Sequence, residues 1–161
     1  MPPAAGKVVD VDRGYKKLRA WFRREGRRRG SHALVGLRSD GPGGAEHSGG
    51  GLTVAEIGSV HEFGLGSAPE RSFIRATFDD NAEKYVRLSQ RLAGRLIDQR
   101  GGNVTQALTQ LGQVGVADII NRINKGIPPE LQEATKERKG SSKQLIDTGQ
   151  LKQSIDFKVV L

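Results

Sequence analysis

V-T-Q-A-L-T-Q-L-G-Q-V-G-V-A-D-I-I-N-R-I-N, from Val104 to Asn124, is the stretch that decides how this 161-residue chain can fold. Its apolar side chains recur at helical spacing and cover more than one face. They are Ala107, Leu108, Leu111, Val114, Ile119, Ile120 and Ile123. A helix that is apolar on several sides has to be buried, so we expect the other elements to pack around this one.

Weaker periodic patterns lie on both sides of the central helix. A helix is predicted from about Asp79 to Gln99, and its apolar stripe consists of Tyr85, Leu88, Leu92 and Leu96. The sequence Thr53-Val54-Ala55-Glu56 is typical of a capping box, which predicts a short helix to about Glu62. Strands are predicted at residues 7–11, 32–38 and 153–160, and a helix at 12–28. Residues 1–161 are therefore expected to form one α+β domain, with a small mixed or antiparallel sheet packed against two or three helices.

The segment from Ser39 to Gly51 is rich in glycine and has no large apolar residue. We expect a long flexible loop that buries nothing. Its glycines lack the spacing and the lysine of a phosphate-binding loop.

The positive charge of the chain is concentrated in residues 1–30. This basic strand-helix segment has ten Lys or Arg against three Asp or Glu, whereas the whole chain has a net charge of +8. Clustered arginines favour an anionic partner, most commonly a phosphate backbone. The candidate DNA-facing or partner-facing residues are Arg23, Arg24, Arg27, Arg28 and Arg29. The chain has no cysteine and no apolar run long enough to span a membrane, so we expect neither disulfides nor membrane insertion.

Three short motifs can each be interpreted without a catalytic role. In H-E-F-G, His61 to Gly64, no second histidine stands at metal-ligand spacing, so a metal site is not predicted. The sequence instead predicts a helix end with Phe63 buried and Gly64 at positive φ. In R-S-F-I-R-A-T-F-D-D-N, Arg71 to Asn81, Phe73 and Ile74 are expected to pack. Arg71 and Arg75 are expected to be available to pair with acidic groups of a neighbouring subunit.

The third motif is R-K-G-S-S-K-Q-L-I-D-T-G-Q-L-K-Q-S-I, Arg138 to Ile155. Its Asp147-Thr148-Gly149 is the triplet of retroviral-type aspartic proteases. Those enzymes need two carboxylates, either from a second copy of the triplet or from a symmetric dimer, and are almost entirely β. No second copy exists in this largely helical pattern, so we interpret Asp147 as the N-cap of one helical turn through Leu151.

In this order, the three motifs resemble those of the tail-completion or neck proteins of long-tailed bacteriophages, also called virion-morphogenesis proteins. The resemblance covers about residues 50–160, and Ser72 stands where the family pattern has proline. The matching residues are His61, Glu62, Phe63, Gly64, Arg71, Phe73, Arg75, Leu145, Ile146, Asp147, Thr148, Gly149, Leu151, Ser154 and Ile155.

The resemblance implies a structural virion protein that joins the completed tail to the head connector. The partners it implies are further copies of the chain in a cyclic homo-oligomer, with sixfold symmetry, around the DNA channel. Connector or head-completion proteins, tail-terminator or tail-tube proteins and the genomic DNA are the others. It implies no enzyme activity, cofactor or metal, and a location in the virion neck after assembly in the host cytoplasm. The alternative hypothesis is a nonspecific nucleic-acid-binding protein that uses the basic N-terminal helix.

Overall fold

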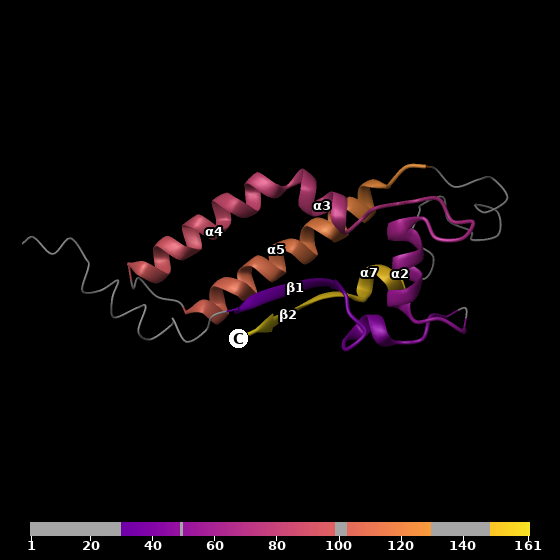
Figure 1. The fold of residues 1–161 in the computed structure, drawn as a ribbon, viewed down its shortest axis with the longest axis horizontal. Coiled ribbons are helices and arrows are strands. Elements are labelled where there is room, and N and C mark those ends of the chain that lie inside the picture. The colour runs from indigo at the N-terminus through magenta and orange to yellow at the C-terminus, as the bar shows by residue number, and fades with distance from the viewer. Residues whose placement is uncertain (1–29, 49, 99–102, 130–148) are drawn as a thin grey trace, which may run out of the picture.

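The computed structural model describes residues 30–48, 50–98, 103–129 and 149–161. These residues form an α+β fold, in which a two-stranded antiparallel sheet packs against helices, as predicted (Figure 1). Strand β1, His32–Leu37, pairs with strand β2, Ile155–Val160, so that His32 lies opposite Val160. These are two of the three predicted strands. The strand predicted at 7–11 and the helix predicted at 12–28 lie outside the described residues.

The helices predicted within the described residues are present, and these residues also form a 3₁₀-helix and a short α-helix that the sequence did not predict. They are the 3₁₀-helix η1 (Pro42–Gly44) and the α-helices α2 (Val54–Phe63), α3 (Arg75–Asp80), α4 (Ala82–Ile97), α5 (Val104–Lys125) and α7 (Gln150–Gln153). The helix predicted from Asp79 to Gln99 is α4, which begins at Ala82, and it is preceded by α3, which the sequence did not predict. The two helices meet at Asn81, whose backbone leaves the helical region at φ −109° and ψ 14°. The Asn81 side chain donates to the Thr77 carbonyl oxygen at 2.8 Å and thereby satisfies the end of α3.

Helix α5 is the central element, as its sequence predicts. It lies along one face of the sheet and contacts β1, β2, α3 and α4 (Figure 1). Ile119 and Ile123 are fully buried, and they belong to a core that also contains Val54, Phe73, Ile127, Leu151 and Ile155. Asn103 and Gln106 form a capping box at its first turn. Tyr85, Leu88, Leu92 and Leu96 of α4 are buried or half-buried, as expected for the stripe that faces α5.

Two buried glycines set the distance between α5 and the sheet. A Cβ atom at Gly112 would lie 2.3 Å from Cδ2 of Phe157, and one at Gly115 would lie 3.2 Å from Cγ1 of Val35. The side chains of both strands therefore occupy the space that a larger residue on α5 would need. The backbone of α5 packs directly against these side chains. They fill space that larger apolar residues on the helix would fill in other domains.

The segment from Ser39 to Gly51 is packed more closely than its composition predicts. Gly43 is buried, because η1 lies against the backbone of Arg38, and Glu46 forms an isolated β-bridge with Thr53. The expectation that this segment buries nothing is therefore wrong. The small size of glycine allows this contact, since a Cβ atom at Gly43 would lie 2.9 Å from the Arg38 carbonyl oxygen.

An ionic network fastens the start of the same segment to β2. Hydrogen bonds from Lys158 and Arg38 lower the pKa of Asp40 to about 2. Arg38 also forms an ion pair with Asp156 of β2, 3.1 Å away.

Among the residues described, no helix is long and apolar enough to cross a membrane.

The close contact at Gly112 can be tested with a matched pair of helical glycines. Gly112→Ala should lower the free energy of unfolding by about 1–3 kcal/mol, because the new methyl group overlaps Phe157. Gly94→Ala in α4 should instead raise it by about 0.5–1 kcal/mol, since nothing lies within 4 Å of its added Cβ and alanine favours helix. Urea unfolding followed by circular dichroism measures both. Equal effects of the two substitutions would contradict this account of the packing.

Candidate functional site

The H-E-F-G motif ends α2 as predicted. Thr53 and Glu56 form the expected capping box at the start of this helix, and Gly64 follows its last residue with a φ of 65°. A Cβ atom at Gly64 would also lie 2.8 Å from the backbone nitrogen of Glu70. Glycine is thus required there both by the left-handed backbone and by the returning chain.

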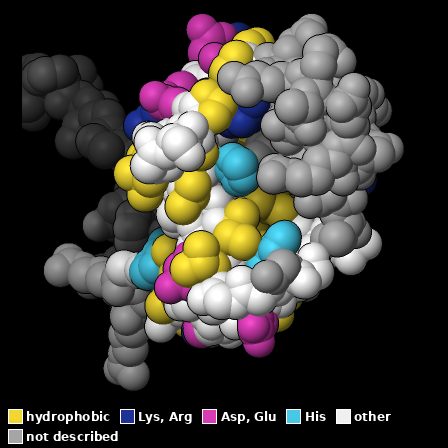
Figure 2. Space-filling view, turned by 90° about the vertical axis from the view of Figure 1, so that its right-hand side faces the viewer, with side chains coloured by type: hydrophobic (Ala, Val, Ile, Leu, Met, Phe, Trp, Pro, Cys, Tyr) yellow, Lys and Arg dark blue, Asp and Glu magenta, His cyan; other side chains and the backbone are white. Residues whose placement is uncertain are grey.

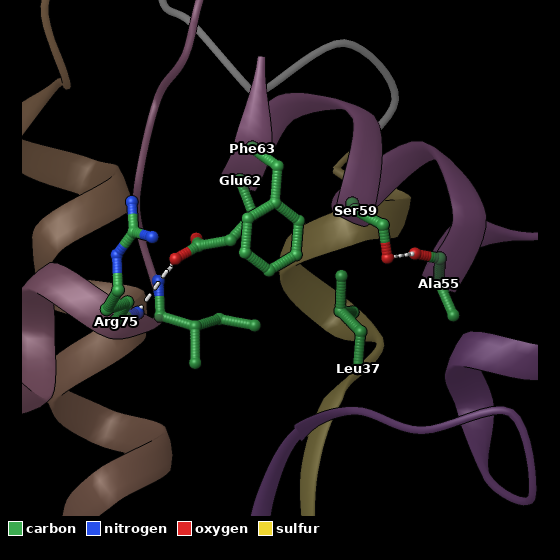
Figure 3. A pocket seen from close by; sticks show the side chains of 8 residues that line it. Leu37, Ala55, Ser59, Glu62, Phe63 and Arg75 are labelled. Atoms are coloured by element: carbon green, nitrogen blue, oxygen red, sulfur yellow. Dashed lines mark hydrogen bonds between the residues drawn. The ribbon is translucent and has the colours of Figure 1, made fainter. Parts of the chain in front are cut away.

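Glu62 joins this motif to the R-S-F-I-R motif. Its side chain is only 4% exposed, and its carboxylate accepts four hydrogen bonds from the segment that leads into α3. Oε2 accepts from the backbone nitrogens of Phe73 at 2.7 Å and Ile74 at 2.9 Å. Oε1 accepts from Oγ of Ser72 at 2.7 Å and from the backbone nitrogen of Arg75 at 2.9 Å, and Figure 3 shows Glu62 beside Arg75. The carboxylate therefore acts as a cap for α3 supplied by a distant part of the chain.

Two arginines hold the same segment from the other side. Arg71 is only 5% exposed, and both Nε and Nη2 donate to the carbonyl oxygen of Pro129, at 3.1 and 3.0 Å. Its burial lowers the pKa of the guanidinium. Arg122 of α5 donates to the carbonyl oxygen of Ser72 at 3.2 Å. We name residues 61–64 and 71–75, together with Arg122 and Pro129, the motif clamp.

The clamp corrects two expectations about its side chains. Arg71 is buried in its own chain, so the prediction that it pairs with a neighbouring subunit is wrong. Phe63 is 56% exposed, so the prediction that it is buried is also wrong. Successive helical residues point about 100° apart, and the inward position at the end of α2 belongs to Glu62. Phe73 is fully buried, as predicted.

The exposed Phe63 borders an apolar hollow. The guanidinium carbon of Arg75 lies 5.7 Å from the centre of the Phe63 ring, and this arginine also forms an ion pair with Glu70. The cavity beside them has a volume of about 220 Å³, and its wall includes Leu37, Gly58 and Ile74 (Figure 3). Figure 2 shows that hydrophobic side chains gather at the surface of this end of the molecule. An apolar hollow beside an exposed aromatic ring is suited to receive an apolar side chain of another protein.

The third motif is described only from Gly149 onward. Leu151, Ser154 and Ile155 are buried and belong to α7 and the start of β2. Helix α7 begins at Gln150 with Gly149 as its N-cap at a φ of 76°, whereas Asp147, the predicted N-cap of this turn, lies outside the described residues. The positive φ of Gly149 turns the chain immediately before the helix. Leu145, Ile146, Asp147 and Thr148 lie outside the described residues, as do the arginines at positions 23, 24 and 27–29.

No family model matches this chain, and no curated protein or solved structure is significantly similar to it. Within the described residues, no three His, Cys, Asp or Glu side chains are grouped so that they could hold a metal ion.

The role of Glu62 predicts a large loss of stability on truncation. Glu62→Ala should lower the free energy of unfolding by about 3 kcal/mol or more, because several backbone donors near the core lose their acceptor. Glu83→Ala is the control. Glu83 also forms an ion pair, but its side chain is 84% exposed, so the loss should stay within about 0.5 kcal/mol.

Hydrogen exchange gives a local measure of the same bond network. The amides of Phe73, Ile74 and Arg75 should exchange faster in Glu62→Ala than in Glu83→Ala, relative to the amides of α5. If the two variants unfold at the same urea concentration and protect these amides equally, Glu62 does not cap α3.

Proposed function

We propose that this chain is a structural subunit of a bacteriophage neck, which completes the tail and joins it to the head connector as a ring around the DNA channel. The observation that carries the proposal is the motif clamp. Two of the three motifs that resemble the neck family are separate in sequence, yet Glu62 binds one to the other through four hydrogen bonds. Two motifs that bind each other in one structural unit support the resemblance to the neck family more strongly than two unconnected motifs would.

The contents of the clamp favour a binding role. The oxygens of the Glu62 carboxylate accept backbone and hydroxyl hydrogen bonds, and Arg71 donates to a carbonyl oxygen within the chain. These charged groups hold the backbone in place. On its outer side the clamp exposes the ring of Phe63 with the apolar hollow beside it, and the guanidinium of Arg75, which is paired with Glu70.

A ring needs two different surfaces on each copy, because a head-to-tail contact pairs one patch with another. The described residues expose apolar side chains in two separate regions, one at α2 and one on the strands. Phe63 is 56% and Leu65 is 51% exposed near α2, whereas Leu34 is 45% and Leu161 is 59% exposed on the strands or just beyond them. Helix α2 and the end of β2 lie at opposite ends of the sheet (Figure 1). We propose that the Phe63 hollow of one copy receives the Leu34 side of the next copy.

The assignment to the neck is tested by deleting the coding sequence from the phage genome that carries it. DNA-filled heads and separate tails should accumulate, as seen by electron microscopy, and a plasmid copy should restore joined particles. Phe63→Ser should fail to restore them although it unfolds at the same urea concentration as the wild-type chain, because Phe63 is exposed. Ser59→Ala, which changes another residue of the cavity wall, should restore them. Joined particles in the deletion strain would contradict the neck assignment.

The contact between copies is tested by disulfide trapping, since the chain has no cysteine of its own. Equal amounts of Phe63→Cys and Leu34→Cys should give a cross-linked dimer under mild oxidation. Phe63→Cys mixed with Val86→Cys is the control, because Val86 is 55% exposed but lies on α4. A chain with both Phe63→Cys and Leu34→Cys should give a ladder of oligomers that ends at the ring size. Equal cross-linking in the control mixture would contradict this head-to-tail arrangement.

A further inference from the structure

Helix α4 carries a row of arginines along one flank of its exposed surface. Arg87, Arg91 and Arg95 are spaced four residues apart, so they lie on nearly the same side of the helix. All three are exposed. We name them the basic ridge. The apolar stripe of α4 packs on α5 and holds the ridge in a fixed position on the fold.

The arginines of the basic ridge repel one another in the isolated chain. Like charges four residues apart on a helix repel each other, and Arg91 has an arginine one turn away on both sides. Arg87 forms an ion pair with Glu83, whereas within the described part of the chain Arg91 and Arg95 form no ion pair. Helix α4 has four basic residues and one acidic residue, although basic and acidic residues are equal in number, eleven each, over all the described residues. An anionic partner would relieve this local excess of positive charge.

We propose that the basic ridge binds the phosphate backbone of double-stranded DNA. The helix rises about 1.5 Å per residue, so successive ridge arginines lie about 6 Å apart along the axis. Phosphates of one DNA strand are about 3.4 Å apart along the duplex axis, so neighbouring arginines can reach about every second phosphate. Gln90 and Gly94 lie beside Arg91 and Arg95 and project no apolar side chain there, whereas the exposed Val86 lies beside Arg87. The inference rests on the proposed function for the source of the DNA, and makes α4 a channel-facing element of the ring.

An acidic surface of a neighbouring copy fits the ridge less well. Most acidic side chains of the described residues already form an ion pair within their own chain. These are Asp40, Glu70, Asp80, Glu83, Asp118 and Asp156. Docking the ridge on them would exchange existing ion pairs for new ones. Contact with DNA requires no such exchange, and the release of counterions from the duplex favours it.

The salt dependence of DNA binding tests the proposal. Binding of the full-length chain to a random-sequence duplex is measured by fluorescence anisotropy over a range of NaCl concentrations. Each phosphate contact contributes about 0.9 to the slope of log K against log salt, so Arg91→Gln with Arg95→Gln should reduce the slope by about 2. Lys125→Gln with Lys152→Gln removes the same charge from α5 and α7, and should leave the slope unchanged. The ridge variant should unfold at the same or a higher temperature, because its repulsion is reduced.

Several results would overturn the proposal. Equal slopes for the ridge variant and the lysine variant would do so, as would a wild-type chain that does not bind the duplex at low salt. If replacing Arg27, Arg28 and Arg29 with Ser removes the slope that the ridge variant keeps, the N-terminal cluster binds DNA and the ridge does not. If the ridge variant loses the oligomer and keeps the slope, the ridge docks on a neighbouring copy.

The deletion experiment separates this inference from the neck assignment. If the deletion strain makes joined particles while the ridge still sets the slope, the neck assignment fails and DNA binding by α4 stands. If complementation depends on the chain while the ridge variant keeps the wild-type slope, the reverse holds.

Discussion

The buried carboxylate of Glu62 is the interaction on which the arrangement of this domain depends. A charge at 4% exposure is costly unless its hydrogen bonds are made, and here the segment from Ser72 to Arg75 supplies them. The hydrogen bonds also satisfy the backbone N–H groups at the start of α3, which need an acceptor. This bond network fixes where the chain turns after α2 and where α3 begins. Arg122 and Arg71 then tie the same segment to α5 and to the chain that follows α5.

The exposed features of the clamp follow from that constraint. Because Glu62 faces inward, the helical repeat turns Phe63 outward, where its ring lies beside the guanidinium of Arg75. The charged groups of the clamp are used within the chain, and its outer surface combines the apolar ring of Phe63 with the guanidinium of Arg75, which is paired with Glu70. A small domain whose α5 approaches the sheet through Gly112 and Gly115 has few large side chains in its core. Contacts with neighbouring subunits would add to the apolar area buried by such a chain.

The proposed ring uses the two kinds of surface differently. Apolar residues at α2 and on the strands would supply the contact between copies, where burial of area provides the free energy. The basic ridge of α4 would face DNA, where the attraction is long-ranged and depends on salt. Within the described residues, the ridge is a charged surface for which the fold provides no complete set of partners. Its sequence signal is three arginines at a spacing of four, on the same helix whose leucines predict the contact with α5.

The sequence by itself determined the α+β class, two strands, the capping box of α2, the central helix and the left-handed Gly64, because each depends on residues near one another in the chain. Only the tertiary structure decided that Glu62 is buried, that Phe63 is exposed, that Arg71 binds Pro129 and that Gly43 is packed. It also placed the start of α7 after Gly149. Glu62 and Arg71 find their partners ten or more positions away, and Gly43 packs on the backbone of Arg38 only because the chain folds back there. The periodicity of a sequence does not indicate such contacts. Local hydrogen bonds determine where a helix ends. Whether a charged side chain beside that end is buried or exposed depends on which groups the rest of the fold brings within about 3 Å.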